Sequence, residues 1–254
     1  MKSTEKNGKS KGANEQKNAK SHKPRYPTYW AERWRGGSKW SEAKITIAHR
    51  IVEEYLEEGD SVILDAGSSL AAVAEVMSKT KAHIDKRLTI LTHNMGAFEI
   101  LNPKEELPQF GYNLLLAGGR YDRDLNALFG PQTETAYETI HPKKIIIGVS
   151  GIRFDEGLYC HGNTEELALK QILFAKPVIH RVIVCDYLKI GVQDALCFGK
   201  MSEILNAASY CSIVTNAPES NVAKEIRNRF EEQKGLLKSL FSSGKIKLDI
   251  VEVS

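Results

Sequence analysis

Seven short apolar runs recur along the chain, and segments with helical periodicity separate them. The runs lie at residues 61–65, 88–92, 113–117, 144–149, 182–185, 212–215 and 246–251. Each has the length of a strand, and in most of them the apolar residues are consecutive rather than alternating, which is typical of strands buried on both faces. Strands of this kind that alternate with helices predict an α/β fold with a mostly parallel sheet.

Helical spacing of apolar residues between the runs predicts the helices that cover the sheet. We expect them at residues 43–58, 70–78, 97–101, 131–140, 164–174, 201–208 and 217–233. Helices on both faces of a parallel sheet make a Rossmann-like, doubly wound fold. Residues 43–254 contain no repeat and no clean linker, so we expect one domain there, and the stretch between 102 and 142 has room for a small inserted subdomain.

The charge of the chain divides into two unlike parts. Residues 1–25 hold eight Lys or Arg and two Glu, a net charge of +6, whereas the rest holds 27 bases and 30 acids, a net charge of −3. A mildly acidic body argues against a strongly basic nucleic-acid-binding core. Because residues 1–25 have almost no apolar side chains, we predict that they form a disordered basic tail.

Residues 26–42 form a connecting segment in which tyrosine and tryptophan are interleaved with arginine and lysine. Aromatic rings among basic side chains suit non-specific contact with nucleic acid. The alternative is that these rings pack against the body of the protein or against a partner subunit. Residues 1–42 therefore carry a hypothesis of non-specific DNA contact, with packing as its competitor.

Several common sites are missing from the sequence. It has no G-x-G-x-x-G dinucleotide fingerprint, no G-x-S-x-G hydrolase elbow, and no His and Cys cluster spaced for a metal. We therefore expect no cofactor and no metal. The four cysteines form no C-x-x-C pair, no apolar run reaches the roughly 20 residues of a membrane span, and no apolar leader begins the sequence. These features predict free thiols in a cytoplasmic protein without membrane contact.

Small and polar residues follow five of the predicted strands, at the sheet edge where folds of this type bind ligands. Amides and hydroxyls at the start of a helix can hold a phosphate, while nearby carboxylates, amides and a cation can bind hydroxyls and neutralise charge. We therefore predict a site for a phosphorylated polyol. Its candidate residues are Asp65, Gly67, Ser68, Ser69, Thr92, Asn94, Gly118, Gly119, Arg120, Ser150, Asp186 and Lys189.

Several of these features also have a plainer interpretation. The two serines after Gly67 could cap a helix, and Lys189 could be a surface lysine. The adjacent Glu165 and Glu166 could form an acid/base group. Alternatively, Thr164 could cap a helix whose N-terminal dipole the two acids favour.

The order and spacing of the loops resemble the C-terminal sensor domain of DeoR/GlpR-type bacterial transcription regulators. The matching motifs are DAGSS at 65–69, THN at 92–94, GGR at 118–120, GP at 130–131, GVSGI at 148–152 and CDYLKIG at 185–191. The resemblance covers about residues 43–216. It implies a fold shared with ribose-5-phosphate isomerase, glucosamine-6-phosphate deaminase and CoA transferases, together with a sugar-phosphate effector and a homo-oligomer.

The resemblance also implies roles for some of the candidate residues. The family's phosphate-contacting turn maps onto Gly67, Ser68 and Ser69, its effector-loop Asn onto Asn94, its paired glycines onto Gly118 and Gly119, and its Asp…Lys loop onto Asp186 and Lys189. Two departures concern the ligand. Tyr187 and Leu188 stand where the family usually has two small polar residues, and His93 lies inside what is usually a Thr-Asn pair. We therefore expect a ligand that differs from the family's usual hexose or pentose phosphates.

A third departure concerns DNA reading. The family normally carries an N-terminal winged helix-turn-helix, and residues 1–42 show no apolar period for its three helices. We therefore predict the ligand-sensing domain of a DeoR-type regulator that acts through a helix-turn-helix partner or through its basic tail. The alternative is a sugar-phosphate isomerase or deaminase of the same fold, with Asp122, Asp124 or Glu156 available as the base.

Overall fold

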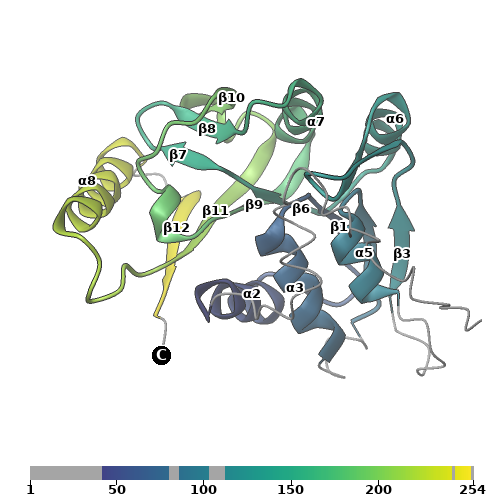
Figure 1. Cartoon of the computed structure of the whole chain (residues 1–254), viewed down its shortest axis with the longest axis horizontal. Coiled ribbons are helices and arrows are strands. Elements are labelled where there is room, and N and C mark those ends of the chain that lie inside the picture. The colour runs from purple at the N-terminus through teal and green to yellow at the C-terminus, as the bar shows by residue number, and fades with distance from the viewer. Residues whose placement is uncertain (1–41, 80–85, 103–111, 242–243, 253–254) are drawn as a thin grey trace, which may run out of the picture.

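The computed structural model describes residues 42–79, 86–102, 112–241 and 244–252. Its centre is a seven-stranded sheet in the order β12-β11-β9-β6-β1-β2-β3, in which every neighbouring pair is parallel (Figure 1). The strands are β1 Ser61–Leu64, β2 Thr89–Thr92, β3 Asn113–Leu116, β6 Lys144–Gly148, β9 Val178–Val184, β11 Ala208–Asn216 and β12 Ile246–Val251. Each overlaps one of the predicted apolar runs, although β9 and β11 begin four residues earlier than predicted. This agreement confirms the α/β class and the mostly parallel sheet.

The strand order places a topological switch point at the middle of the sheet. From β1 the chain moves outward through β2 to β3, and it then returns to β6, on the other side of β1, and continues through β9 to β11 and β12. The loops after β1 and β6 therefore turn away from each other. In parallel sheets this divergence opens a crevice at the carboxyl ends of the two strands.

Helices cover both faces of the sheet (Figure 1). On one face lie α2 Glu42–Glu54, α3 Ser68–Lys79 and α5 Met95–Leu101, and on the other lie α6 Pro131–Thr139, α7 Thr164–Ala175 and α8 Lys224–Leu240. Each layer has its own cluster of buried apolar side chains against the sheet. None of the helices in the described part of the chain is long and apolar enough to cross a membrane.

Two small antiparallel sheets, which the sequence did not lead us to expect, accompany the α6–α7 layer. The first pairs β4 Arg120–Asp122 with β5 Ala127–Phe129, in the interval where we expected a small subdomain. The second has the order β10-β8-β7, with β7 Gly151–Arg153, β8 Gly157–Cys160 and β10 Leu196–Lys200. Its strands lie after the fourth main strand, outside the interval from 102 to 142.

Two predicted helices are wrong in extent or in kind. Of residues 201–208, only Met201–Glu203 is helical, as a short 3-10 turn, and Ala208 begins β11 because it pairs with Val178 of β9. The helix expected at 217–233 begins only at Lys224 and continues to Leu240. Pro218 keeps Ala217 out of the helix, since the residue before a proline is disfavoured in helical backbone. Leu237, buried near the end of the helix, explains the extension.

The predicted N-terminal segments stay hypotheses. The basic tail of residues 1–25 lies outside the described residues, and so does all of the connecting segment except Glu42, which begins α2.

Candidate functional site

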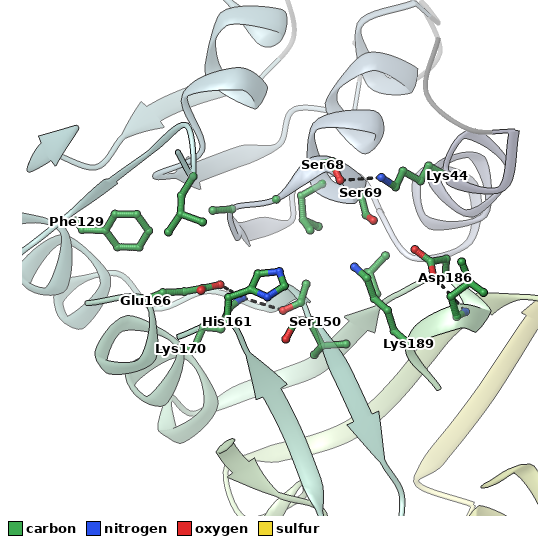
Figure 2. A pocket seen from close by; sticks show the side chains of 18 residues that line it. Lys44, Ser68, Ser69, Phe129, Ser150, His161, Glu166, Lys170, Asp186 and Lys189 are labelled. Atoms are coloured by element: carbon green, nitrogen blue, oxygen red, sulfur yellow. Dashed lines mark hydrogen bonds and ion pairs between the residues drawn. The ribbon is translucent and has the colours of Figure 1, made fainter. Parts of the chain in front are cut away.

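A cleft of about 390 Å³ opens at the switch point, at the carboxyl ends of β1, β6 and β9. Its volume falls in the range of small-molecule sites. Figure 2 shows that its polar side chains come from both layers and point toward a common space. These side chains are Lys44, Ser68, Ser69, Ser150, His161, Glu166, Lys170, Asp186 and Lys189, and Leu125, Phe129 and Leu188 are among the apolar ones.

The N-terminus of α3 forms one wall of the cleft. Gly67, which precedes it, has φ +119°, a conformation that glycine adopts without strain. The first helical hydrogen bond runs from Ala71 N–H to Gly67 O, 3.1 Å, so the earlier amides begin the helix without an intrahelical acceptor. Lys44 Nζ, from α2, donates to Ser68 Oγ at 2.8 Å. Free amides, the helix dipole and an ammonium thus converge where an anion would be stabilised.

The loop after β9 forms the opposite wall. It is a 3-10 turn, Tyr187–Lys189, capped by Asp186, whose Oδ1 accepts from Leu188 N–H at 3.2 Å. Lys189 points from this turn into the cleft (Figure 2). Arg229 of α8 fixes the turn from behind, with Nε donating to Ile190 O and Nη2 to Leu188 O, both at 3.0 Å. The position of Lys189 therefore depends on a helix that does not itself line the cleft.

A buried ion pair lies under the cleft and joins β1, β6 and α7. Lys170 Nζ donates to Asp65 Oδ2 at 2.5 Å and to Gly148 O at 2.8 Å, and Gly148 N–H donates to the same Asp65 oxygen at 3.0 Å. The two side chains are only 4% and 1% exposed. Burial acts to lower the pKa of Lys170, but the carboxylates of Asp65 and Glu166 outweigh it, so the pKa is raised and Lys170 stays charged.

Glu166 is the carboxylate that enters the cleft from α7. Its Oε1 lies 3.8 Å from Lys170 Nζ, and its Oε2 is buried without a hydrogen-bond partner among the described residues. Burial raises the pKa of Glu166, while the charge of Lys170 acts in the opposite direction. The cap of α7 is Asn163, whose Oδ1 accepts from the amides of Glu165 and Glu166 at 2.9 and 3.1 Å. The expectation that Thr164 is the cap was therefore wrong by one residue.

Half of the residues predicted for the site line this cleft. They are Gly67, Ser68, Ser69, Ser150, Asp186 and Lys189.

Three more of the predicted residues, Asp65, Thr92 and Asn94, are buried and hold the loops in place. Asn94 Nδ2 donates to Gly67 O at 3.1 Å while its Oδ1 accepts from Ala97 N–H, which caps α5. Thr92 Oγ1 donates to Leu64 O at 2.7 Å. These contacts shape the loop after β1 rather than present groups to the cleft.

The remaining three predicted residues lie beside the cleft and do not line it. Gly118 O accepts a hydrogen bond from Thr133 Oγ1 at 2.5 Å, and Gly119 packs closely on Phe129. Arg120 forms an ion pair with Glu165 at the start of α7. The sequence analysis missed Lys44 and Lys170, which enter from helices. Lys170 carried a signal, because it stands beside Leu169 and three residues before Leu173, on the apolar stripe of its helix.

His93, the departure from the Thr-Asn pair, lies behind Asp65 and is buried. Its Nδ1 lies 2.6 Å from the Tyr137 hydroxyl, and its Nε2 lies 3.7 Å from Asp65 Oδ1. Burial lowers the pKa of His93 to about 4, although Asp65 opposes the shift. The imidazole is therefore neutral near pH 7 and contributes to the support of the loops.

This pKa makes the stability of the fold depend on pH. The unfolded chain takes up a proton at this residue near pH 6.5, and the folded chain does so only near pH 4. The contribution of the neutral histidine to the free energy of unfolding is complete above pH 6.5 and is lost as the pH falls toward 4. Between pH 7 and pH 5 the loss amounts to about 2 kcal/mol. Urea unfolding should show this loss in the wild type relative to His93→Gln. Equal pH slopes in the two proteins would contradict the buried, neutral histidine.

Comparison with known protein sequences identifies a family for most of the chain. Residues 39–217 match the DeoR C terminal sensor domain. The HTH-type transcriptional repressor GlcR of Bacillus subtilis (strain 168) is 27% identical over 164 residues, which are 65% of this chain and 58% of GlcR. The lactose phosphotransferase system repressor of Streptococcus mutans is 25% identical over 177 residues, which are 68% of this chain and 64% of that repressor. The chain thus spans about three fifths of the length of these relatives.

Among solved structures, ribose 5-phosphate isomerase A from Methanocaldococcus jannaschii matches with a TM-score of 0.39 and 12% identity, over 57% of this chain and 52% of that one. The family match rests on the sequence and covers well over half of the chain. The chain therefore belongs to the family of DeoR C-terminal sensor domains.

Proposed function

We propose that this chain is the effector-sensing part of a transcription regulator and that its cleft binds a phosphorylated sugar or a related metabolite. The observation that carries the proposal is the convergence of the α3 N-terminus, Lys44 and Lys189 on one cleft at the switch point. Membership of the sensor-domain family supports the regulatory role. GlcR and the lactose phosphotransferase system repressor, which are similar to this chain, are named as repressors.

The geometry suggests how the ligand would lie. A phosphate would accept from the first amides of α3 and from the hydroxyls of Ser68 and Ser69, and Lys189 would neutralise it from the opposite wall. Asp186 and Ser150 would meet hydroxyl groups of the sugar. Because the two walls follow different strands, one ligand that contacts both would stabilise their closed arrangement. We propose that a helix-turn-helix partner, or DNA contact by residues 1–42, turns this change into regulation.

Replacing Lys189 with alanine should weaken binding of a sugar phosphate by about 10- to 100-fold, the usual range for a lost hydrogen bond to a charged group. Isothermal titration calorimetry with ribose 5-phosphate, glucose 6-phosphate and fructose 6-phosphate measures the affinity. Lys200→Ala is the matched control, since Lys200 is an exposed lysine that does not line the cleft. The unphosphorylated sugars should bind far more weakly. Equal affinities of Lys189→Ala and the wild type would contradict the proposed phosphate site.

The alternative function, an isomerase or deaminase of the same fold, needs a carboxylate beside the reacting carbon. Asp122, Asp124 and Glu156, which the sequence offered for this role, do not line the cleft. The carboxylates that do line it are Glu166 and Asp186. Conversion of a bound sugar phosphate in the calorimetry samples, detected by NMR, would favour the enzyme over the sensor.

A further inference from the structure

Charge is unevenly distributed along the cleft. Lys44 and Lys189 lie with Ser68 and Ser69 toward one end, and Glu166 and Lys170 lie toward the other (Figure 2). The first end offers amides, hydroxyls and two ammonium groups, with the Asp186 carboxylate beside Lys189, and the proposed function assigns the phosphate to it. The second end has to recognise whatever part of the ligand lies away from the phosphate.

At this second end, two carboxylates share one ammonium. Lys170 directs its short hydrogen bond, 2.5 Å, to Asp65, and it lies 3.8 Å from Glu166. A further donor of Lys170 goes to Gly148 O. Asp65 also accepts from the Gly148 amide, so its charge is well compensated. Glu166 is the carboxylate that remains short of a counter-charge.

The neighbouring basic side chains are engaged elsewhere. His161 Nδ1 lies 2.9 Å from Asp194 Oδ2, and Arg120 is paired with Glu165. Among the described residues, Glu166 forms an ion pair with Lys170 and with no other side chain. Its second oxygen, Oε2, is buried with no hydrogen-bond donor among those residues. A buried carboxylate oxygen without a donor is unfavourable. The Glu166 side chain is 14% exposed and lines the cleft, so a rotation of its carboxylate would present this oxygen to a ligand group that supplies the donor.

Two kinds of ligand group could supply this donor, and they differ in charge. A sugar hydroxyl can donate to Oε2 but leaves the two carboxylates with one ammonium. An ammonium group donates and also supplies the missing positive charge, and charge-assisted hydrogen bonds are roughly twice as strong as neutral ones. The same end of the cleft would hold an acetylated amine poorly, because acylation removes the charge.

We propose that the cleft selects a phosphorylated amino sugar, with the phosphate at the α3 end and the free ammonium group paired with Glu166. This inference rests on the proposed function and narrows its ligand class. It makes Glu166 a specificity-determining residue, while Lys170 and Asp65 position it from below.

Matched ligands test the proposal on the unmodified full chain. Calorimetry at pH 7 compares glucosamine 6-phosphate with glucose 6-phosphate, and galactosamine 6-phosphate with galactose 6-phosphate. In at least one pair the amine should bind about 10-fold more tightly or better, the ratio expected of a charge-assisted contact. N-acetylglucosamine 6-phosphate, which has an amide in place of the amine, should show no such advantage.

Two variants test whether Glu166 causes the preference for the amine ligand. Glu166→Gln should bind the amine and the hydroxyl ligand of that pair with affinities within about threefold of each other, because it keeps the shape and loses the charge. Glu165→Gln is the matched control and should keep the preference, since Glu165 does not line the cleft and pairs with Arg120.

Three outcomes would overturn the inference. If the hydroxyl ligands bind as tightly as the amines in both pairs, the ammonium site is wrong and the proposed sugar-phosphate sensor stands. If Glu166→Gln keeps the preference, another group reads the amine. If no phosphorylated sugar binds at millimolar concentration, both the inference and the proposed function fail. The comparison of ligands on the wild type needs no variant, so it decides even if Glu166→Gln does not fold.

Discussion

Replacing Gly119 with alanine should lower the free energy of unfolding by about 4 kcal/mol, from steric overlap and backbone strain together. Gly119 has φ +135°, which L residues rarely adopt, and a Cβ there would lie 2.6 Å from Phe129 O and closer still to Thr133 Oγ1. The backbone oxygen belongs to β5 and has no room to retreat. Chemical denaturation with urea measures the loss.

The adjacent glycine is the matched control. A Cβ at Gly118 would lie 3.5 Å from the Gln132 Cβ, an ordinary van der Waals contact, and its φ is not in the left-handed region. Gly118→Ala should therefore cost less than about 1 kcal/mol. A similar loss from both substitutions would mean that the close packing of Gly119 on β5 and α6 is wrong. Comparing these two substitutions also shows whether the GGR loop acts through packing, in addition to the ligand contact that the resemblance implies.

Asp65→Asn should lower the free energy of unfolding by about 4 kcal/mol, in the range measured when one partner of a buried ion pair is removed. The substitution keeps the size of the side chain, and an amide oxygen can still accept from Gly148 N–H. What it removes is the charge that compensates buried Lys170 at 2.5 Å. Glu166, at 3.8 Å, is left as the partner of that ammonium.

A double-mutant cycle tests whether the loss comes from the pair. In Asp65→Asn combined with Lys170→Met, both charges are gone, and the double variant should be more stable than the sum of the single losses by about 2 kcal/mol. Urea unfolding at pH 7 gives all four stabilities. Additive losses would show that the two side chains do not stabilise each other, and the ion pair under the cleft would then lose its structural role.

The main sheet was predictable because its central strands are buried on both faces. Runs such as Ile145–Ile147 hold consecutive apolar residues, and no surface helix keeps such a pattern in water. The small sheets were not predictable by the same rule. β7, β8 and β10 are three to five residues long, each contains a glycine, and pairing with one another gives them their structure. At Ala208, pairing with Val178 of β9 likewise overrode the helical spacing that predicted a helix up to this residue.

The location of the cleft was predictable from topology, whereas the direction of its side chains was not. Loops at the carboxyl ends of parallel strands meet at one edge, so Ser68, Ser150 and Lys189 could be named from the order of strands and loops. Lys44 and Lys170 reach the cleft only because α2 and α7 dock beside it, and docking of helices cannot be read from local spacing. Asp65 was named for contact with ligand, but the buried ammonium of Lys170 turns its carboxylate inward.

The hydrogen bonds from Arg229 to the loop after β9 bear on where the binding unit ends. The sensor-domain match stops at residue 217, and α8 begins at Lys224. A fragment trimmed to that match would contain every side chain that lines the cleft. It would lack the guanidinium that holds the carbonyls of Leu188 and Ile190 on either side of Lys189. The smallest piece that presents this lysine correctly is therefore longer than the piece that sequence similarity delimits.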